Sequence, residues 1–443
     1  MQGSQRFGFA CLRCAPALDF ARDDNGRDHG VAETGCREFR ARSLMDAALR
    51  SRFNADFTPE RYRALLQTIN ETERWPADFR IAETPIFLTR EFKRELVTAG
   101  QEILARLRTP EFAQHAADAI PPGLSVPNET AHPIFLQIDF AICEDGAGRL
   151  TPRLIELQGF PSLYAFQVFE LRAMRAAYPA IPAAWTSFFG GLDEASYLAL
   201  LRRVMLADAD PENVVLLEIE PEQQKTRIDF ACTETFLGVR PVCLTNIRQR
   251  GRQLFYERDG REVRVERIYN RVIFDELLRR PDLRFGFDFQ ADLDVTWVGH
   301  PNWYFRISKH TLPFLKSAHT APAFFANEFP AESENLADYV LKPLFSFAGL
   351  GVEMDPSPAR LAALEKPREW ILQKKVAYAD FLPTADGHRS KGEIRLMFLW
   401  PEGGEPRLAN NLARLSQGRM MGVDFNRDKT WVGSSIALHD GSV

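Results

Sequence analysis

The strongest constraint on the fold is the run PIFLQIDFAICEDGAGRLTPRLIELQGFP at residues 133–161, in which two β-rich stretches flank a short turn. The turn, residues 145–148, contains two glycines, which readily adopt the backbone conformations of tight turns. This run therefore predicts an antiparallel β-hairpin. Alternation along its strands places Asp139 and Glu156 near the strand ends and puts Glu156 and Gln158 on one face.

Three residues of this hairpin carry oxygen donors, namely Asp139, Glu156 and Gln158. Hard cations such as Mg²⁺ bind oxygen ligands, and in ATP-using enzymes the nucleotide phosphates complete a site begun by one or two carboxylates. The hairpin is therefore a candidate Mg²⁺ site. Taken alone, it is equally compatible with a surface hairpin whose carboxylates are solvated.

Length and charge set the broad class of the protein. The chain has 443 residues, which is enough for two or three packed units. Its net charge of −5 and pI near 6.0 lack the basic footprint that is typical of nucleic-acid binding. No stretch approaches the roughly 20 apolar residues that cross a bilayer, and Arg and Asp stand where a secretory signal would be apolar. We expect a cytoplasmic protein that binds neither nucleic acid nor membrane.

Residues 1–44 are rich in Arg, Asp and Gly and show no apolar periodicity. Such a segment cannot bury enough surface to offset its chain entropy, so we expect a disordered tail, either an appendage or a start-site artefact. It contains Cys11 and Cys14, which with Cys36 and His29 form a weak zinc-site candidate. The scattered spacing of the six cysteines predicts reduced thiols.

Residues 45–209 also carry helix signals around the hairpin. Apolar periodicity and capping residues predict helices at four places: from Pro59 to Glu71 behind the cap Thr58, near residues 89–107, near residues 164–177, and after the cap Asp193. The strand-like VVLLEI near residue 213, a helical stretch at 222–237 and the strand-like RPVCLT follow. This order predicts a βαβ unit and a small α/β domain at residues 210–305.

The run YVLKPLFSFAGLGVEM delivers Lys342 from an apolar strand into a turn with Ser346, Gly349 and Gly351. Backbone N–H groups of such a turn can close over phosphates while the lysine supplies a positive charge. The order of residues differs from that of a P-loop. On its own, such a segment is more often a plain turn after a strand.

The run EWILQKKVAYAD changes from a strand to a connection at Gln373, Lys374, Lys375 and Val376. Such a connection can present main-chain groups to the edge of an adenine, and Asp380 can reach a ribose. The alternative, which this segment alone favours, is a strand end with solvated lysines.

The run GEIRLMFLW places Glu393 and Arg395 on one face of a strand. Arg414 in NLARLS lies close to the same sheet if the intervening PEGGEP is a hairpin turn. Guanidinium groups suit a bidentate grip on phosphate or carboxylate, so both arginines are candidates for holding a transferring phosphoryl group. A cross-strand salt bridge is the alternative.

Together, these runs resemble the ATP-grasp ligases in rearranged order. The DF and ELQ hairpin precedes the LKP loop, which is similar to the circularly permuted ATP-grasp proteins related to the glutathionylspermidine synthase-like amide ligases. The small α/β domain that precedes the ATP-grasp in that group resembles two runs here, VVLLEIEPEQQKTRIDF and VERIYNRVIFDEL. The segment with which the ATP-grasp begins in that group resembles ISKHTLPFL. The resemblance spans roughly residues 130–420.

The resemblance implies an α/β (α+β) fold in which residues 45–209 hold helices and the metal-binding half, and residues 306–443 hold the nucleotide-binding half. It implies ATP and Mg²⁺ as cofactors. Asp139, Glu156 and Gln158 would hold Mg²⁺, and Lys309 and Lys342 would meet the phosphates. The loop with Ser346 and Gly349 to Gly351 would cover the phosphates, the Gln373 to Val376 connection would take the adenine, and Arg395 with Arg414 would stabilise the transferred group.

The sequence departs from the family pattern in four places, one of which is the connection, where Gln373 and lysines stand in place of the common acidic residues. Gln158 replaces an Asn, Gln137 replaces an Arg that would clamp phosphate, and Pro313 follows the expected cap Ser308 closely enough to kink or delay the next helix. The implied activity is an ATP-dependent carboxylate–amine ligase acting through an acyl phosphate on small-molecule substrates. The alternatives are a catalytically inactive nucleotide-binding or regulatory protein and a phosphoryl transferase. The sequence leaves the identity of the substrates and the oligomeric state open.

Overall fold

The computed structural model describes residues 45–346, 349–421 and 426–442, and these belong to one compact unit. The predicted tail at residues 1–44, with its zinc-site candidate, lies outside the described residues. Among the described helices, none is both long and apolar enough to cross a membrane.

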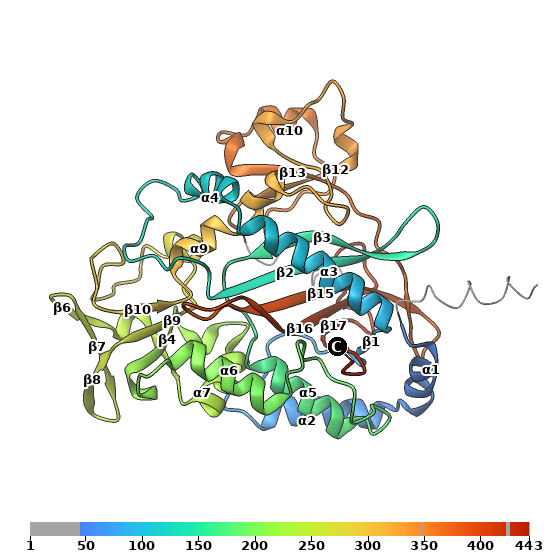
Figure 1. Ribbon diagram of the computed structural model, residues 1–443, viewed down its shortest axis with the longest axis horizontal. Helices are drawn as coiled ribbons and strands as arrows, with labels where there is room; N and C mark the ends of the chain where they lie inside the picture. The colour runs from blue at the N-terminus through green and yellow to red at the C-terminus, as the bar shows by residue number, and fades with distance from the viewer. Residues whose placement is uncertain (1–44, 347–348, 422–425, 443) are drawn as a thin grey trace, which may run out of the picture. The chain divides into compact units, whose positions relative to one another are not determined.

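A large sheet occupies the middle of this unit (Figure 1). Its main strands run in the spatial order β17 (Gly433–Ser435), β16 (Arg407–Ser416), β15 (Arg389–Leu399), β2 (Phe135–Glu144) and β3 (Leu150–Gln158), and β14 (Leu382–Pro383) pairs with β15. All of these pairs are antiparallel. The predicted hairpin is confirmed, and the two halves of the sheet come from opposite ends of the chain.

One detail of the hairpin prediction is wrong. Asp139 lies in the middle of β2, opposite Arg395 of β15 and Glu156 of β3, and the register shifts by a bulge directly after it. β2 begins before Asp139, at Phe135, and pairs with β15 along one edge and with β3 along the other. Asp139 therefore sits inside a sheet, at 0% exposure.

Helices cover the large sheet on both faces (Figure 1). On one face α3 (Arg90–Leu107) packs so closely that a Cβ on Gly100 would lie 2.6 Å from Leu396 Cδ1. On the other side of the sheet lie α2 (Pro59–Glu71), α5 (Phe166–Ala177) and α6 (Glu194–Leu206). The predicted caps are confirmed, because Thr58 and Asp193 accept backbone hydrogen bonds at the starts of α2 and α6.

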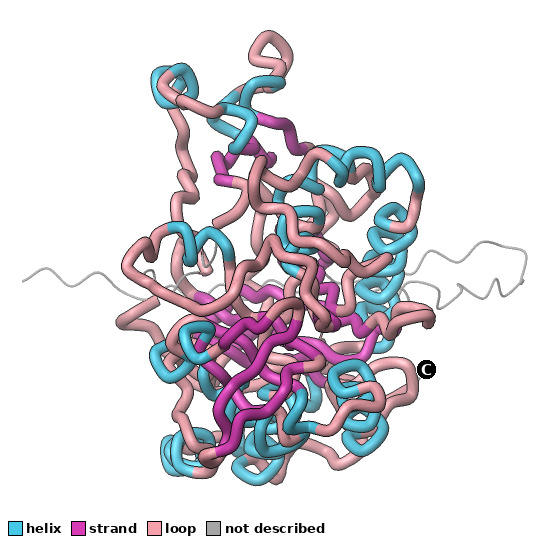
Figure 2. Tube along the Cα trace, turned by 90° about the vertical axis from the view of Figure 1, so that its left-hand side faces the viewer, coloured by secondary structure: helices cyan, strands magenta, loops and turns pink. Residues whose placement is uncertain are grey.

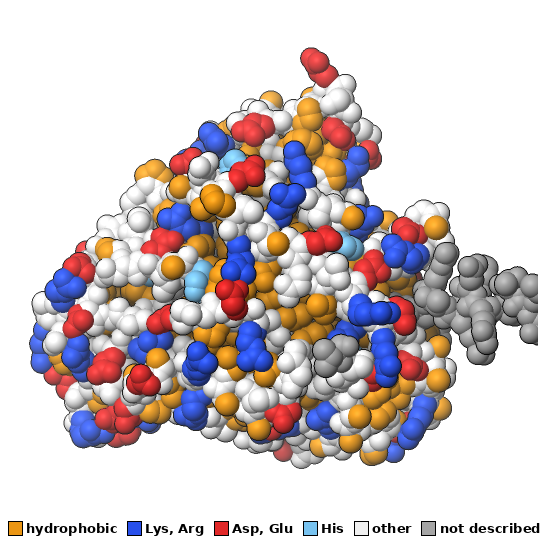
Figure 3. Space-filling view, viewed as in Figure 1, with side chains coloured by type: hydrophobic (Ala, Val, Ile, Leu, Met, Phe, Trp, Pro, Cys, Tyr) orange, Lys and Arg blue, Asp and Glu red, His pale blue; other side chains and the backbone are white. Residues whose placement is uncertain are grey.

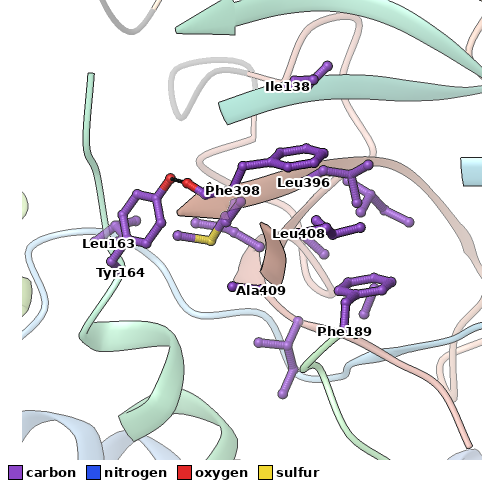
Figure 4. Packing of buried hydrophobic residues seen from close by; sticks show 14 of the residues in the cluster. Ile138, Leu163, Tyr164, Phe189, Leu396, Phe398, Leu408 and Ala409 are labelled. Atoms are coloured by element: carbon purple, nitrogen blue, oxygen red, sulfur yellow. Dashed lines mark hydrogen bonds between the residues drawn. The ribbon is translucent and has the colours of Figure 1, made fainter. Parts of the chain in front are cut away.

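The core of the unit is apolar and well packed around β15. Figure 4 shows Leu396 and Phe398 of β15 beside Leu408 of β16, and Tyr164 donates a hydrogen bond to the Phe398 carbonyl at 2.9 Å. Burial of these side chains stabilises the sheet by roughly 1.5–3 kcal/mol each. The close packing fixes the register between β2 and β15, which in turn fixes the polar residues on the opposite face.

A smaller parallel sheet follows in the order β10 (Thr296–Val298), β9 (Arg267–Asn270), β4 (Val214–Glu218) and β5 (Arg240–Cys243). Helix α7 (Arg227–Leu237) connects β4 to β5, so the predicted βαβ unit is confirmed. The chain order reverses between β4 and β9, whose carboxyl ends therefore form a switch point, a common place for ligands in α/β sheets. A hairpin-linked sheet of β6 (Arg248–Arg250), β7 (Gln253–Arg258) and β8 (Arg261–Val265) adjoins it in sequence.

A third sheet of three antiparallel strands, β11 (Ala323–Phe325), β13 (Trp370–Lys374) and β12 (Tyr339–Pro343), stands apart from the large sheet in Figure 2. It has its own small core of Tyr339, Leu341, Leu364 and Leu372. The segment before it, Lys309–Phe314, is a 3₁₀ helix with Pro313 inside, which agrees with the expected disturbance of this helix.

The remaining elements are short. They are α1 (Ala47–Asp56), α4 (Pro110–Ala117), α8 (Phe274–Leu278), α9 (Pro301–Arg306), α10 (Pro358–Ala362), the parallel pair β1 (Ile86–Phe87) and β18 (Ala437–Leu438), and the 3₁₀ turns at 211–213, 221–223, 244–246, 326–328, 336–338 and 367–369. Acidic and basic side chains are interspersed on the face in Figure 3, which agrees with the many surface ion pairs.

Candidate functional site

Asp139 is gripped by two arginines on the polar face of the large sheet. Its Oδ1 accepts a hydrogen bond from Arg395 Nε at 2.6 Å, and its Oδ2 accepts from Arg395 Nη2 at 2.7 Å and Arg414 Nη2 at 2.6 Å. Burial acts to raise the pKa of Asp139, but the two guanidinium groups outweigh it and hold that pKa below its usual range. The sheet register creates this arrangement, because Arg395 stands directly opposite Asp139.

Glu393 extends the same ionic arrangement toward Arg414. The two residues are cross-strand partners, and Arg414 Nη2 lies 2.8 Å from Glu393 Oε2. The other oxygen of Glu393 accepts a hydrogen bond from the Tyr378 hydroxyl. Burial raises the pKa of Glu393 despite the nearby Arg414.

Two lysines reach the neighbouring strand β3 from later parts of the chain. Lys309 Nζ lies 3.0 Å from Glu156 Oε1 and donates to the Ser346 carbonyl at 2.7 Å. Lys342 Nζ donates to Gln373 Oε1 at 2.6 Å and to the Ile155 carbonyl at 3.3 Å. The early acidic hairpin and the late lysine strand therefore meet at β3.

The contacts of Glu156 and Lys342 shift the pKa values of both side chains. Burial acts to raise the pKa of Glu156, but Lys309 and Lys342 oppose it and leave that pKa below its usual range. Burial lowers the pKa of Lys342 to about 8. The lysines and Glu156 therefore share one partly desolvated environment.

We call the seven charged residues Asp139, Glu156, Lys309, Lys342, Glu393, Arg395 and Arg414 the ion-pair cluster. It contains four cations and three carboxylates, an excess of one positive charge when all are ionised. Beside it, residues including Glu156, Gln158, Lys309 and Ser346 line a cavity of about 20 Å³. A cavity of that size holds roughly one water.

Of the residues predicted to bind adenine and ribose, only Gln373 contacts the ion-pair cluster. Gln373 joins it through its side chain, whereas Lys374 pairs with Glu334 at 3.3 Å and Lys375 with Asp355 at 2.9 Å. Alternation along β13 accounts for the opposite directions of Gln373 and Lys374. Val376 is half-buried and Asp380 is exposed in the connection that follows. The adenine and ribose roles of this connection stay predictions.

The turn after β12 has the backbone that its glycines predict. Gly349 and Gly351 both adopt positive φ, at 76° and 75°, which other residues reach only with strain. A Cβ on Gly351 would lie 3.1 Å from Pro343 Cγ, so the turn folds back on the strand. Ser346, at its start, has a buried hydroxyl without a hydrogen-bond partner among the described residues. Closure of this turn over phosphates stays a prediction.

Sequence reasoning missed Arg271 at the switch point of the small parallel sheet. Arg271 directly follows β9 and is 5% exposed, yet its Nε and Nη1 have no hydrogen-bond partner among the described residues. Its guanidinium carbon lies 4.8 Å from the Phe160 ring centroid. Two buried carboxyl groups, Glu218 at the end of β4 and Asp229 of α7, interact electrostatically with Arg271, and burial raises the pKa of both. A buried cation with free donors is suited to an anionic group.

A chain of rings links Arg271 to the ion-pair cluster. Phe160 follows the Glu156 strand by two residues, and its ring centroid lies 5.9 Å from that of Tyr304. Tyr304 in turn lines the cavity beside Glu156 and Lys309. The only signal for Arg271 in the sequence was its position at the end of a hydrophobic strand. Its place at a switch point depends on which strand lies beside β9, and the sequence did not identify that strand.

The predicted Mg²⁺ ligands do not fit a metal in this arrangement. Both oxygens of Asp139 already accept hydrogen bonds from guanidinium groups, and Glu156 is paired with Lys309. Among the described residues, no group of three or more His, Cys, Asp or Glu side chains is placed to hold a metal ion. Binding of Mg²⁺ by Asp139 would require at least one buried ion pair to break, which is strongly unfavourable.

No family model matches the sequence, and no curated protein matches it. A solved structure does match: the apo form of a glutathione synthetase-like effector from Globodera pallida, with 10% sequence identity and a TM-score of 0.52. The match covers 88% of this chain and 96% of the effector. At this identity the likeness concerns the fold alone, and this chain shares the mixed α/β fold of that glutathione synthetase-like protein.

Proposed function

We propose that the ion-pair cluster binds the triphosphate of ATP and that the protein uses ATP to join a carboxylate to an amine, as a circularly permuted ATP-grasp ligase. The convergence of Lys309, Lys342, Arg395 and Arg414 on one polar sheet face carries the proposal. Four cations from separate segments suit a polyanion better than a single phosphate. The fold shared with a glutathione synthetase-like structure supports it.

The order of elements supports the permuted form. The acidic hairpin β2–β3 comes first in the chain, and the lysine strand β12 with its partner β13 comes after the small parallel sheet. In this proposal the triphosphate lies between the polar face of the large sheet and the three-stranded sheet.

The chemistry would proceed in two steps. A carboxylate oxygen attacks the γ-phosphorus, the bond to the β-phosphate oxygen breaks, and ADP leaves an acyl phosphate. An amine then attacks the acyl carbon, loses a proton and expels inorganic phosphate. Lys342 and Arg414 would stabilise the negative charge on the transferred group, and the protein would align the two reactants and exclude water. Because the predicted metal ligands do not fit Mg²⁺, no step is assigned to a metal.

Arg271 would hold a carboxylate of the acid substrate. Its two unpartnered nitrogens and its low exposure leave it in need of an anionic partner. Phe160 and Tyr304 lie between it and the cavity beside Glu156, so an acid held there would extend toward the ion-pair cluster. An acid with a second carboxylate remote from the reacting one fits this placement.

The test is ADP release in a panel of amino acids and short peptides combined with amines. We expect continuous turnover of ATP to ADP only when both acid and amine are present, because the acid alone yields one ADP for each acyl phosphate formed. We expect Lys342→Met to lower the rate of turnover at least 100-fold because it removes a charge from the proposed phosphate site. Lys366→Met is the matched control, since Lys366 is exposed and pairs with Glu369 on the surface. Equal rates for Lys342→Met and the parent would contradict the proposal.

A second candidate is a nucleotide-binding protein without catalysis. The double grip on Asp139 favours it, because a carboxylate held by two arginines cannot serve a metal or a proton transfer without losing a partner. Binding of ATP in a thermal-shift assay, with no ADP release across the whole panel, would decide for this candidate.

A further inference from the structure

Two of the three carboxylates in the ion-pair cluster are fully committed to protein cations. Each Asp139 oxygen accepts at least one guanidinium hydrogen bond. One Glu393 oxygen accepts a hydrogen bond from Tyr378, and the other is ion-paired with Arg414. Both residues are almost completely buried. Releasing Asp139 would leave Arg395 uncompensated in the sheet, and releasing Glu393 would remove one of the two carboxylate partners of Arg414, so neither is available as a ligand.

Glu156 differs from these two because it is partly open to solvent. Its side chain is 27% exposed, and its ion pair is with Lys309 through Oε1. A phosphate oxygen that approached Lys309 would compete with Glu156 for the same ammonium group. The negative charge of Glu156 would therefore oppose the binding of an anion.

The cations of the cluster have capacity that its carboxylates do not use. Arg414 is 36% exposed at its side chain, and its buried Nε has no hydrogen-bond partner among the described residues. Lys309 and Lys342 each spend a hydrogen bond on a neutral backbone or amide oxygen, which a charged phosphate oxygen would replace favourably. The excess of one cation makes the cluster receptive to an anion without a metal.

We infer that this site binds polyphosphate directly through Lys309, Lys342 and Arg414 without Mg²⁺, and that Glu156 is an internal counter-ion which the polyphosphate displaces from Lys309. The inference rests on the proposed nucleotide site and specifies how its ligand is held. The sequence predicted that Glu156 binds Mg²⁺, whereas in this inference Glu156 competes with the polyphosphate for Lys309.

The experiment measures Kd by calorimetry on the full chain, for ATP and for inorganic tripolyphosphate, each in EDTA and in excess Mg²⁺. We expect both ligands to bind in EDTA at least as tightly as with Mg²⁺, because Mg²⁺ neutralises part of the charge that the cations recognise. Binding of tripolyphosphate assigns the affinity to the phosphates. Binding of ATP alone in EDTA also supports the inference and makes the nucleoside a required part of the ligand.

Two variants test the role of Glu156. Glu156→Gln removes the competitor, so we expect about threefold tighter binding or more in EDTA. Lys309→Met removes a phosphate partner, so we expect at least about tenfold weaker binding. Glu369→Gln and Lys366→Met are the matched controls from an exposed surface pair, and we expect neither to change Kd.

A metal-dependent site gives a different pattern. If EDTA weakens ATP binding tenfold or more and Glu156→Gln weakens it further, the inference is overturned while the nucleotide site stands. If neither ligand binds under either condition, the proposed function fails together with the inference. The comparison of EDTA with Mg²⁺ uses the unmodified protein, so it remains decisive even if a variant does not fold.

Discussion

Two buried arginines of this protein, Arg395 and Arg271, differ in how their charge is balanced. Arg395 on the large sheet makes a bidentate contact with Asp139 and a third hydrogen bond to Gln137 at 3.0 Å. Arg271 at the edge of the small parallel sheet is equally buried but leaves two nitrogens unpartnered among the described residues. The charge and the hydrogen-bond donors of Arg395 are satisfied within the protein, whereas those of Arg271 would be satisfied only by a bound ligand.

The largest effect is expected from Asp139→Ala. This change leaves Arg395 and Arg414 without their shared carboxylate inside the sheet, and the loss of one member of a buried pair costs about 3–5 kcal/mol. Urea unfolding followed by circular dichroism measures it. A loss below about 1 kcal/mol would show that Asp139 is not the structural anchor of these arginines.

A pH effect of intermediate size is expected from Glu218, beside Arg271. Burial raises its pKa from 4.5 to about 8 in the folded protein, so between these values the folded state holds a proton that the unfolded state has lost. This group therefore lowers the free energy of unfolding by about 1.4 kcal/mol for each unit of rising pH. Glu218→Gln should remove that slope, so its stability relative to the parent should rise from pH 5 to pH 7. Parallel stability curves for the two proteins would contradict this.

Arg271→Met should change stability by only about 1 kcal/mol or less, because it replaces a buried guanidinium that has two unpartnered nitrogens with an apolar side chain of similar length. It should nevertheless abolish the use of an acid substrate that carries a second carboxylate. Unfolding curves and ADP release measure the two effects separately. A large destabilisation would mean that Arg271 is structural, as Arg395 is.

The smallest effect is expected from Glu369→Gln, which removes a solvent-exposed partner of Lys366. Exposed ion pairs contribute roughly 0–1 kcal/mol, so the free energy of unfolding should stay within about 0.5 kcal/mol of the parent value. Thermal unfolding measures it. A larger loss would mean that exposure is a poor guide to the value of ion pairs in this protein.

The sequence predicted what depends on local patterns. Thr58 and Asp193 were identified as helix caps from residue type and position, and the turn at residues 145–148 identified the hairpin. Lys342 was singled out because an apolar strand delivers it into a glycine-bearing turn. These signals are carried by neighbours in the chain.

Features that depend on distant partners were not predictable in the same way. The grip of Arg395 on Asp139 joins residues 256 positions apart and requires the register of β2 against β15. The Mg²⁺ site was predicted from the oxygen donors in the hairpin alone, because the sequence does not show which cations lie opposite them. Arg271 can be recognised as a candidate site residue only from the order of the parallel strands, which places the end of β4 beside it.

The pairing of β2 with β15 also bears on how the protein is made. A ribosome adds roughly 5–20 residues per second, so the hairpin that contains Asp139 leaves the exit tunnel tens of seconds before Arg395 is synthesised. During that interval one edge of β2 has no partner strand, and its apolar residues are open to other chains. Such late, long-range closure slows folding and invites aggregation. Production of this protein should therefore depend on chaperones, and on slow expression at low temperature.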